Sequence, residues 1–335
     1  MRLIAMRLIT ARLIMIAAAL AFLPGAALAE DYPTRPINIV VPAAAGGPTD
    51  TISRITAQAM SKLLGQQITI ENAGGAGGTI GTGRVVRAEP DGYTLLIYHV
   101  GLATAATLYR KLPYDTRTAF ASVGLVTDAP MTIIARSDLA PNTLAELIAY
   151  LKDRSTKEGA KTTFGNAGTG SASHLCEMLF KSRVPAQLTA VPYRGTGPVM
   201  NDLIGKQIDM SCDQATNTTG PISSRQVKAY AVTTRARLAS LPDVPTADEA
   251  GLKGFELGVW HGVFAPRGTP PAIVDRLSTA LRGALKDPDL VKRFHDINTE
   301  PMPLARATPE AAQRMLLSEI DRWAPIINAS GEYAD

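Results

Sequence analysis

Two turns rich in glycine and small side chains carry the groups best suited to hold an anion. The first turn, residues 43–49, follows the apolar segment Ile37–Val41 and precedes apolar residues at helical spacing that end before Gly65. The first turn of a helix offers unpaired N–H groups and the positive end of the helix dipole. We therefore expect this turn to hold a carboxylate without any chemical step, and Pro48 suits the start of the helix.

The second turn shows the same order of strand, glycine-rich turn and helix start later in the chain. A predicted strand at residues 162–165 leads into the turn at 166–174, and apolar residues at helical spacing follow it. The turn contains three hydroxyls, those of Thr169, Ser171 and Ser173. One serine would serve as an N-cap, but three hydroxyls exceed what one cap needs. We interpret this turn as a second anion-binding corner.

The glycine run at residues 74–81 invites comparison with nucleotide-binding loops. It fails the dinucleotide pattern G-x-G-x-x-G, because Gly75 and Gly77 fit but Ile80 occupies the third position. No G-x-x-x-x-G-K-[ST] motif occurs either. We read the run as a turn that lets a helix approach closely, and we expect no cofactor.

The sequence lacks the usual metal-binding motifs, and it does not decide whether its cysteines form a disulfide. It has no Cys-x-x-Cys and no histidine pair at ligand spacing, so we expect no metal site. The two cysteines, Cys176 and Cys212, are equally compatible with a disulfide and with two buried thiols.

A secreted serine hydrolase is the main alternative from a different functional class. It would use Ser171 or Ser173 as nucleophile with His174 as base. Neither serine has the flanking glycines of G-x-S-x-G. His174 directly follows Ser173, and helix neighbours one residue apart point in different directions. We therefore expect no enzymatic activity.

The first 29 residues have the pattern of a secretory signal peptide. Three arginines precede an apolar run at residues 13–23, and residues 27–29 resemble a cleavage site that ends at Ala29. We expect cleavage after Ala29 and a periplasmic protein, with an uncleaved anchor as the alternative. Removing those three arginines reduces the formal charge from +4 to about +1. No basic cluster interleaved with aromatics remains, so we expect no nucleic-acid partner.

Alternating strands and helices predict an α/β fold with parallel strands flanked by helices. We expect two domains: residues 30–131 with 234–335 form the first, and residues 132–233 form the second. Two extended crossings, near Met131 and Ala231, would act as a hinge. Ligands in such sheets lie beyond the carboxyl ends of strands. The two turns and His99 would meet in a cleft there.

In order along the mature chain, nine short segments resemble the Bug-type substrate-binding proteins of tripartite tricarboxylate transporters, the TctC-like family. These segments are Tyr32-Pro-Thr-Arg-Pro36, Val41-Pro-x-x-x-Gly-Gly47 with Asp50, Glu71-Asn-x-x-Gly-Ala-Gly-Gly78, Pro90-Asp-Gly-Tyr-Thr94, Leu112-Pro-Tyr-Asp115, Gly170-Ser-x-Ser-His174, Val191-Pro-Tyr193, Leu241-Pro-Asp-Val-Pro-Thr246 and Ala265-Pro-x-Gly-Thr-Pro270. The resemblance implies a type II-like Venus flytrap that closes on an organic acid and delivers it to a membrane permease. A ligand sensor for a membrane kinase would use the same binding chemistry.

The resemblance also assigns roles to individual residues. It makes the two turns the clamps on one carboxylate and places Asp213 where relatives that bind amino acids contact an ammonium group. Ala43 and Ala44 stand where an aromatic is usual, and Arg194 replaces a common lysine with a planar fork that suits a second carboxylate. An aromatic or dicarboxylic acid is the ligand this suggests, bound by a monomer. The candidate ligand-binding residues are Ala43, Ala44, Ala45, Gly46, Gly47, Thr49, Gly78, Thr79, His99, Thr169, Gly170, Ser171, Ala172, Ser173, Arg194, Asp213, Trp260 and His261.

Overall fold

The computed structural model describes residues 32–157 and 161–334, of which residues 35–157 and 161–334 belong to one compact unit. The predicted signal peptide, residues 1–29, lies outside the described residues. Among the helices of the described part, none combines the length and the apolar character that a membrane crossing requires.

Strands and helices alternate through the first part of this unit, as the apolar periodicity predicts. The elements are β1 (Ile37–Val41), α2 (Pro48–Leu64), β2 (Ile68–Asn72), the short 3-10 helix η1 (Ala76–Gly78), α3 (Thr79–Val86), β3 (Thr94–His99), α4 (Gly101–Leu108) and β4 (Phe120–Arg136). Helix α2 begins with Pro48 and ends at Gly65, which adopts the left-handed conformation that suits glycine.

The same alternation continues after β4 and ends in three consecutive helices. The elements are α5 (Leu144–Ser155), β5 (Thr162–Asn166), α6 (Ala172–Arg183), β6 (Leu188–Pro192), α7 (Thr196–Ile204), β7 (Met210–Gln214), α8 (Ala215–Ser223), β8 (Val227–Val232), β9 (Gly258–Pro266), α9 (Pro271–Ala284), α10 (Pro288–Asp296) and α11 (Pro309–Ser330).

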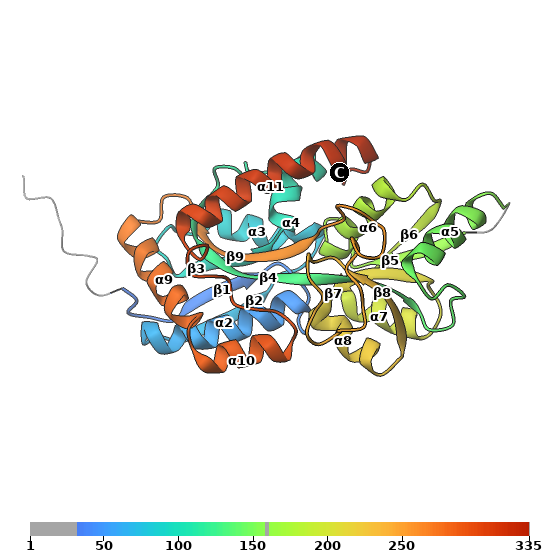
Figure 1. Cartoon of the computed structure of the whole chain (residues 1–335). Coiled ribbons are helices and arrows are strands. Elements are labelled where there is room, and N and C mark those ends of the chain that lie inside the picture. The colour runs from blue at the N-terminus through green and yellow to red at the C-terminus, as the bar shows by residue number, and fades with distance from the viewer. Residues whose placement is uncertain (1–31, 158–160, 335) are drawn as a thin grey trace, which may run out of the picture. The chain divides into compact units, whose positions relative to one another are not determined.

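The strands fall into two sets that share the 17-residue strand β4 (Figure 1). Strand β4 pairs with β9 over Phe120–Pro130, and β9 continues the first set in the order β9-β3-β1-β2. From Met131 to Arg136, β4 pairs instead with β7 and β8, and β7 continues to β5 and β6. The pairing of β4 therefore changes partner between Pro130 and Met131.

The predicted α/β class is confirmed, although the sheet is mixed rather than parallel throughout. The pairs β1–β2, β1–β3, β5–β6 and β5–β7 are parallel. Strand β9 runs antiparallel to both β3 and β4, and β4 runs antiparallel to β7. The sequence pattern did not reveal this because β4 and β9 carry the chain between the two sets and back, without the helical crossover that makes neighbours parallel.

Helices cover both faces of the strands and complete the core. Helix α2 packs on α9 and α10, whereas α11 packs on α4, β4 and α6. Strand residues such as Ile39, Leu96 and Phe164 are fully buried, as expected for strands that are covered on both faces. A disulfide between Cys176 and Cys212 fastens α6 to β7, which decides between the two possibilities that the sequence left open.

Thr233 fastens the segments that connect the two strand sets. Its hydroxyl donates to the Leu257 carbonyl at 2.6 Å, and the same oxygen lies 3.1 Å from the donating Met131 N–H. The Thr233 backbone N–H donates to the Met131 carbonyl at 2.9 Å. One fully buried residue thus joins the start of the second half of β4 to the chain that returns into β9.

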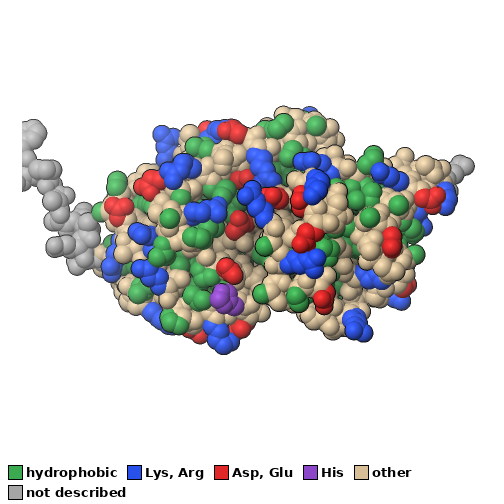
Figure 2. All heavy atoms as spheres, viewed as in Figure 1, with side chains coloured by type: hydrophobic (Ala, Val, Ile, Leu, Met, Phe, Trp, Pro, Cys, Tyr) green, Lys and Arg blue, Asp and Glu red, His purple; other side chains and the backbone are tan. Residues whose placement is uncertain are grey.

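Charged side chains of both signs are interspersed on the face shown in Figure 2, where Lys and Arg alternate with Asp and Glu. Ion pairs of the described surface include Lys62–Asp287 and Arg237–Glu249. Such pairs contribute little to stability because solvent screens them.

Candidate functional site

A cavity of about 760 Å³ lies between the two strand sets, beyond the carboxyl ends of β1, β3, β5 and β7. Both predicted turns line it, which brings residues more than 120 positions apart to one space. The lining residues are Pro42, Ala43, Ala44, Gly47, Pro48, Thr49, Gly74, Gly75, Ala76, Gly77, Gly78, Tyr98, His99, Tyr109, Ala167, Gly168, Thr169, Ser171, Ala172, Ser173, Tyr193, Arg194, Gly195, Thr196, Asp213, Gln214 and Ala334.

The cavity lining includes the first helical residues of α2, α6 and α7 and the N-cap residue of α8, so four helices start at this cavity. Gly47, Gly195 and Gln214 cap three of them without any side-chain hydrogen bond to the first-turn amides. In α2, the described residues provide no acceptor for the backbone N–H groups of Thr49 and Asp50. Each helix start carries a partial positive charge, so the cavity favours an anion.

Asp50 shapes the first turn. Its carboxylate accepts from the Gly46 N–H at 2.8 Å, from Arg54 at 3.0 Å and from Asn72 at 3.0 Å. Burial alone would raise the pKa of Asp50, but the hydrogen bonds from Arg54, Gly46 and Asn72 outweigh it and lower the pKa. The carboxylate is thus ionised and fully engaged, and it fixes the loop instead of lining the cavity.

The serines of the second turn are similarly engaged. Ser171 caps α6, since its hydroxyl accepts from the His174 N–H at 3.2 Å. The Ser173 hydroxyl accepts from the Ala167 N–H at 2.8 Å and lies 3.1 Å from the Ser171 hydroxyl. These bonds fix the conformation of the turn, and the described residues provide no acceptor for the backbone N–H groups of Ala172 and Ser173.

The hydrolase alternative is not supported by the position of His174. Its Nδ1 accepts from the Gly170 N–H at 3.3 Å, and its Nε2 lies 3.2 Å from the Glu332 carboxylate. Both ring nitrogens are therefore occupied away from Ser171 and Ser173. A serine nucleophile needs a base within hydrogen-bond reach of its hydroxyl, and neither serine has one here.

His99 presents a neutral N–H donor to the cavity. Its Nδ1 accepts from the Gly101 N–H at 2.9 Å, so the ring proton resides on Nε2. Burial, reinforced by nearby His261, lowers the pKa of His99 well below its ordinary value. The described residues give Nε2 no partner, and His99 lines the cavity. The imidazole can donate to a ligand without carrying a charge.

His261 supports Thr49 from behind. Its Nδ1 donates to the Val259 carbonyl at 2.9 Å, which leaves Nε2 to accept from the Thr49 hydroxyl at 3.2 Å. Burial lowers the pKa of His261 to about 4, so the ring is neutral at physiological pH. The Thr49 hydroxyl therefore donates to His261 and not to a ligand. The group of Thr49 that can donate to a bound anion is its backbone N–H.

Asp213 and Gln214 bring acceptors to the same space. Burial raises the pKa of Asp213 to about 6, although Asn217 and the Gln214 N–H donate to its two oxygens at 2.6 and 2.8 Å. The side-chain oxygen of Gln214 is buried and has no hydrogen-bond partner among the described residues. Two neighbouring groups can thus engage a hydroxyl or ammonium group on a ligand.

Arg194 is the only Lys or Arg among the described residues that line the cavity. It is exposed at the mouth, on the loop before α7, and no described residue forms a hydrogen bond or ion pair with its side chain. The neighbouring Tyr193 hydroxyl donates to Asp202 at 2.6 Å, which anchors the loop. The guanidinium is free to bind an acidic group.

The walls of the cavity approach each other closely. The Tyr98 hydroxyl donates to the Gly77 carbonyl at 2.8 Å, and the Tyr109 hydroxyl donates to the Thr169 carbonyl at 3.5 Å. A Cβ added to Gly77 would lie 2.6 Å from both the Thr169 oxygen and the Tyr109 hydroxyl. Glycine at position 77 is therefore what allows the 74–78 run to reach the second turn.

Most of the predicted site residues line the cavity, but six do not. Ala45, Gly46, Thr79 and Gly170 belong to the predicted loops but are not among the lining residues. His261 is fully buried behind Thr49, and Trp260 lines a different cavity. The sequence analysis did not assign Tyr98, Tyr109, Tyr193, Thr196 or Gln214 to the site. Tyr109 comes after α4, and Thr196 and Gln214 mark helix starts that only the topology brings to this edge.

Comparison with known proteins identifies relatives along nearly the whole chain. Residues 52–331 match the model of the family described as "Tripartite tricarboxylate transporter family receptor". A protein of Agrobacterium vitis, encoded in the TAR-I ttuE-ttuC' intergenic region and named as a UPF0065 protein, is 51% identical over 311 residues, which cover 92% of this chain and 89% of that protein.

Two solved structures are similar in both sequence and fold. The periplasmic binding protein BugD is 48% identical with a TM-score of 0.84, and the match covers 91% of this chain and all of that one. MatC from Rhodopseudomonas palustris, solved with bound malate, is 40% identical with a TM-score of 0.82, and covers 88% of this chain and all of its own.

The fold and the cavity between two strand sets define a solute-binding receptor of the periplasmic binding protein class, not an enzyme. The chain belongs to the tripartite tricarboxylate transporter family of receptors. The family that the short sequence segments indicate is thereby confirmed.

Proposed function

We propose that this receptor captures a dicarboxylic acid, aliphatic or aromatic, in the cavity between its strand sets. The observation that carries the proposal is the meeting of four helix starts at a cavity whose described lining includes a single Lys or Arg, the unpaired Arg194. The helix starts select for negative charge, and the single cation at the mouth selects for a second negative group.

The first carboxylate is held by backbone N–H groups. The unpaired amides of Thr49 and Asp50 approach from one side, and the start of α6 at Ala172 approaches from the other. Each helix start contributes about 0.3–1 kcal/mol toward a nearby anion, and partly buried geometry increases this. The neutral N–H of His99 adds a further donor.

The second carboxylate is bound by Arg194. A guanidinium can hold a carboxylate with two parallel hydrogen bonds, which sets its distance from the amide-bound group. MatC, which is 40% identical, was solved with malate, a dicarboxylate. Ala43 and Ala44 have small side chains, and the aromatic residues Tyr98 and Tyr109 also line the cavity, so an aromatic diacid also fits this chemistry.

Asp213 and Gln214 favour a ligand that carries a hydrogen-bond donor on its carbon chain. Both carry side-chain oxygens at the cavity, and that of Gln214 has no partner among the described residues. A hydroxyl on the carbon chain of the acid would donate to one of them. Because Asp213 has a pKa of about 6, it accepts more readily above that pH and repels a carboxylate less below it.

The receptor role includes closure and delivery. We assign residues 30–131 and 234–335 to one domain and residues 132–233 to the other, with β4 and the Thr233–Leu257 connection as the hinge. The closed receptor, a monomer exported to the periplasm, would deliver its ligand to the membrane permease of a tripartite transporter. The family assignment supports this step.

Calorimetric titration of the protein tests the ligand class. Malate, succinate, adipate, phthalate and terephthalate form the panel, and each diacid is compared with its monomethyl and dimethyl esters. We expect at least one diacid to bind, its monoester to bind at least tenfold more weakly, and its diester not to bind. Equal heats for a diacid and its diester would overturn the proposal, and equal affinity for diacid and monoester would remove the role of Arg194.

A further inference from the structure

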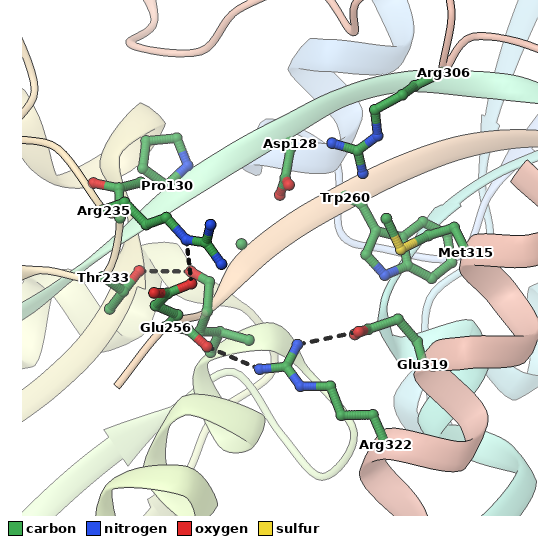
Figure 3. A pocket seen from close by; sticks show the side chains of 13 residues that line it. Asp128, Pro130, Thr233, Arg235, Glu256, Trp260, Arg306, Met315, Glu319 and Arg322 are labelled. Carbon is green, nitrogen blue, oxygen red and sulfur yellow. Dashed lines mark hydrogen bonds and ion pairs between the residues drawn. The ribbon is translucent and has the colours of Figure 1, made fainter. Parts of the chain in front are cut away.

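A second cavity, of about 620 Å³, lies on the other side of β9 from the first. Successive side chains of a strand point to opposite faces. His261 accordingly lies behind the first cavity, while its neighbour Trp260 lines the second. Strand β4, the segment 233–235 and helix α11 supply other walls (Figure 3).

Two ion pairs account for most of the charge around this second cavity. Arg235 donates to Glu256 at 2.9 Å, and Arg322 pairs with Glu319 at 3.1 Å. Arg322 also donates to the Glu256 carbonyl at 2.9 Å. Figure 3 shows these contacts forming one edge of the cavity, opposite Asp128 and Arg306.

Three polar groups remain without a partner among the described residues. Asp128 and Arg306 line the cavity, and neither side chain forms a hydrogen bond or ion pair with a described residue. The third group is the indole N–H of Trp260, whose side chain is only 2% exposed. An indole N–H can only donate, so it lacks an acceptor here.

The backbone makes room for one of these groups. The Asp128 carboxylate lies directly over Gly258, so that any side chain at position 258 would collide with it. Asp128 and Trp260 occupy facing positions on β4 and β9. Figure 3 shows the indole beside Met315, and shows the Asp128 carboxylate and the Arg306 guanidinium turned into the space above it.

Asp128 and Arg306 are both exposed residues, and both line this cavity. Although the side chain is accessible from the cavity, desolvation by the surrounding protein raises the pKa of its carboxyl, and Arg306 lowers it less. A carboxylate in this condition gains from a cationic donor placed against it.

We propose that this second cavity binds a small zwitterion with a primary ammonium and a carboxylate, such as an α-amino acid. The ammonium group contacts Asp128, and the carboxylate accepts from Arg306 and from the Trp260 indole N–H. The unpaired groups match this ligand in number and sign: one anion, one cation and one neutral donor. The volume lies within the range of small-molecule sites.

Simple ions fit the cavity less well. An anion alone would leave Asp128 uncompensated and facing it, whereas a cation alone would leave Arg306 and the indole N–H unused. The competing arrangement is a direct Asp128–Arg306 pair with water on the indole, and the experiment must separate it from ligand binding.

Nuclear magnetic resonance of the indole N–H groups provides the test. The chain has two tryptophans, so a ¹⁵N-labelled sample gives two indole signals, which Trp260→Phe assigns. Glycine, L-alanine, L-serine and L-glutamine are each added at about 10 mM, which saturates a site of millimolar affinity or better. Acetate and methylammonium, alone and together, are the controls. We expect the Trp260 signal to move with an amino acid and not with either half.

Variants show whether the change in the Trp260 signal arises from binding in the second cavity. Asp128→Asn and Arg306→Gln should each weaken the amino-acid titration about tenfold or more. The exposed α9 variants Asp275→Asn and Arg276→Gln are matched controls and should leave it unchanged. The proposal is overturned if no amino acid moves the Trp260 signal, if acetate alone moves it equally, or if Asp213→Asn abolishes the shift, since that would place the amino acid in the first cavity.

Discussion

The Thr233 hydroxyl donates to the Leu257 carbonyl at 2.6 Å, while the Met131 N–H donates to the same hydroxyl oxygen at 3.1 Å. These bonds join three segments at the point where β4 changes its pairing partners. Because the group is buried, none of its bonds can be replaced by water without local opening.

Thr233→Val should therefore destabilise the protein by about 1–3 kcal/mol, since it removes the hydroxyl and leaves the Leu257 oxygen and the Met131 N–H underbonded. Urea unfolding measures the change. Thr234→Val is the matched control, because the Thr234 hydroxyl bonds to the Ala236 carbonyl in an exposed position. We expect the control to cost less than about 0.5 kcal/mol. Equal losses in the two variants would show that the buried hydroxyl has no special role.

Asp213 should make stability depend on pH. The folded protein keeps this proton to about pH 6 because burial raises the pKa, whereas the unfolded chain releases it near pH 4. Between those values the unfolded state binds fewer protons, so the free energy of unfolding falls as the pH rises. The difference of about two pKa units corresponds to about 3 kcal/mol.

The measurement compares urea unfolding of the wild type and Asp213→Asn at pH 4.5 and pH 7. The stability of the wild type relative to the variant should decrease from the lower to the higher pH. Asp275→Asn on the exposed face of α9 should show no such trend. Parallel pH profiles for the wild type and Asp213→Asn would contradict the raised pKa.

Arg194 should distinguish diacids from monoacids. Arg194→Gln should weaken the preferred diacid about tenfold or more, because it removes a charge-assisted bond, typically worth about 1.5–3 kcal/mol. Arg194→Lys should also weaken diacids more than monoacids, because an ammonium lacks the planar fork. Calorimetry with a diacid and its monomethyl ester measures both. The exposed variant Arg183→Gln serves as a control, and matched losses for diacid and monoester would reject the assigned role.

Gly77 should be required for closure around the ligand. In Gly77→Ala the new methyl group would meet the Thr169 oxygen and the Tyr109 hydroxyl at 2.6 Å, so the 74–78 run and the second turn would be held apart. We expect the affinity for the preferred acid to fall about tenfold or more. Calorimetry gives the affinity, and solution scattering gives the radius of gyration with ligand.

Gly46→Ala is a matched control for Gly77→Ala. Both glycines have a positive φ, but an added Cβ at Gly46 has no neighbour within 4 Å. The two variants therefore share the cost of the left-handed backbone and differ in the collision across the cavity. If both lost the same affinity, backbone strain would account for the effect and closure at Gly77 would not.

The sequence predicted the two turns well because strand, glycine-rich loop and helix start are local patterns. The start of α6 at Ala172 follows from hydroxyls that precede apolar residues at helical spacing. The disulfide could not be predicted in this way, since the separation of Cys176 and Cys212 in space depends on how α6 packs against β7.

Two predicted site residues, Trp260 and His261, do not line the first cavity, because the direction of a strand side chain alternates from one residue to the next. Trp260 and His261 adjoin in sequence but face opposite sides of β9, and neither enters the first cavity. Nearly every residue of β9 is buried, so apolar alternation gives no sign of which face is which. Gln214 and Thr196 were missed because α7 and α8 reach the cavity only through the order of β5, β6 and β7.

The corners that hold the proposed carboxylate consist of main-chain N–H groups, which no substitution other than proline removes directly. A change of ligand can therefore be sought at side chains that line the cavity, such as Arg194, Tyr109 and Gln214, without altering these corners. Affinity for a carboxylate and selectivity among acids thus depend on different parts of the chain. A binder for a different acid can be engineered by changing lining side chains while the loops that supply the backbone N–H groups are left intact.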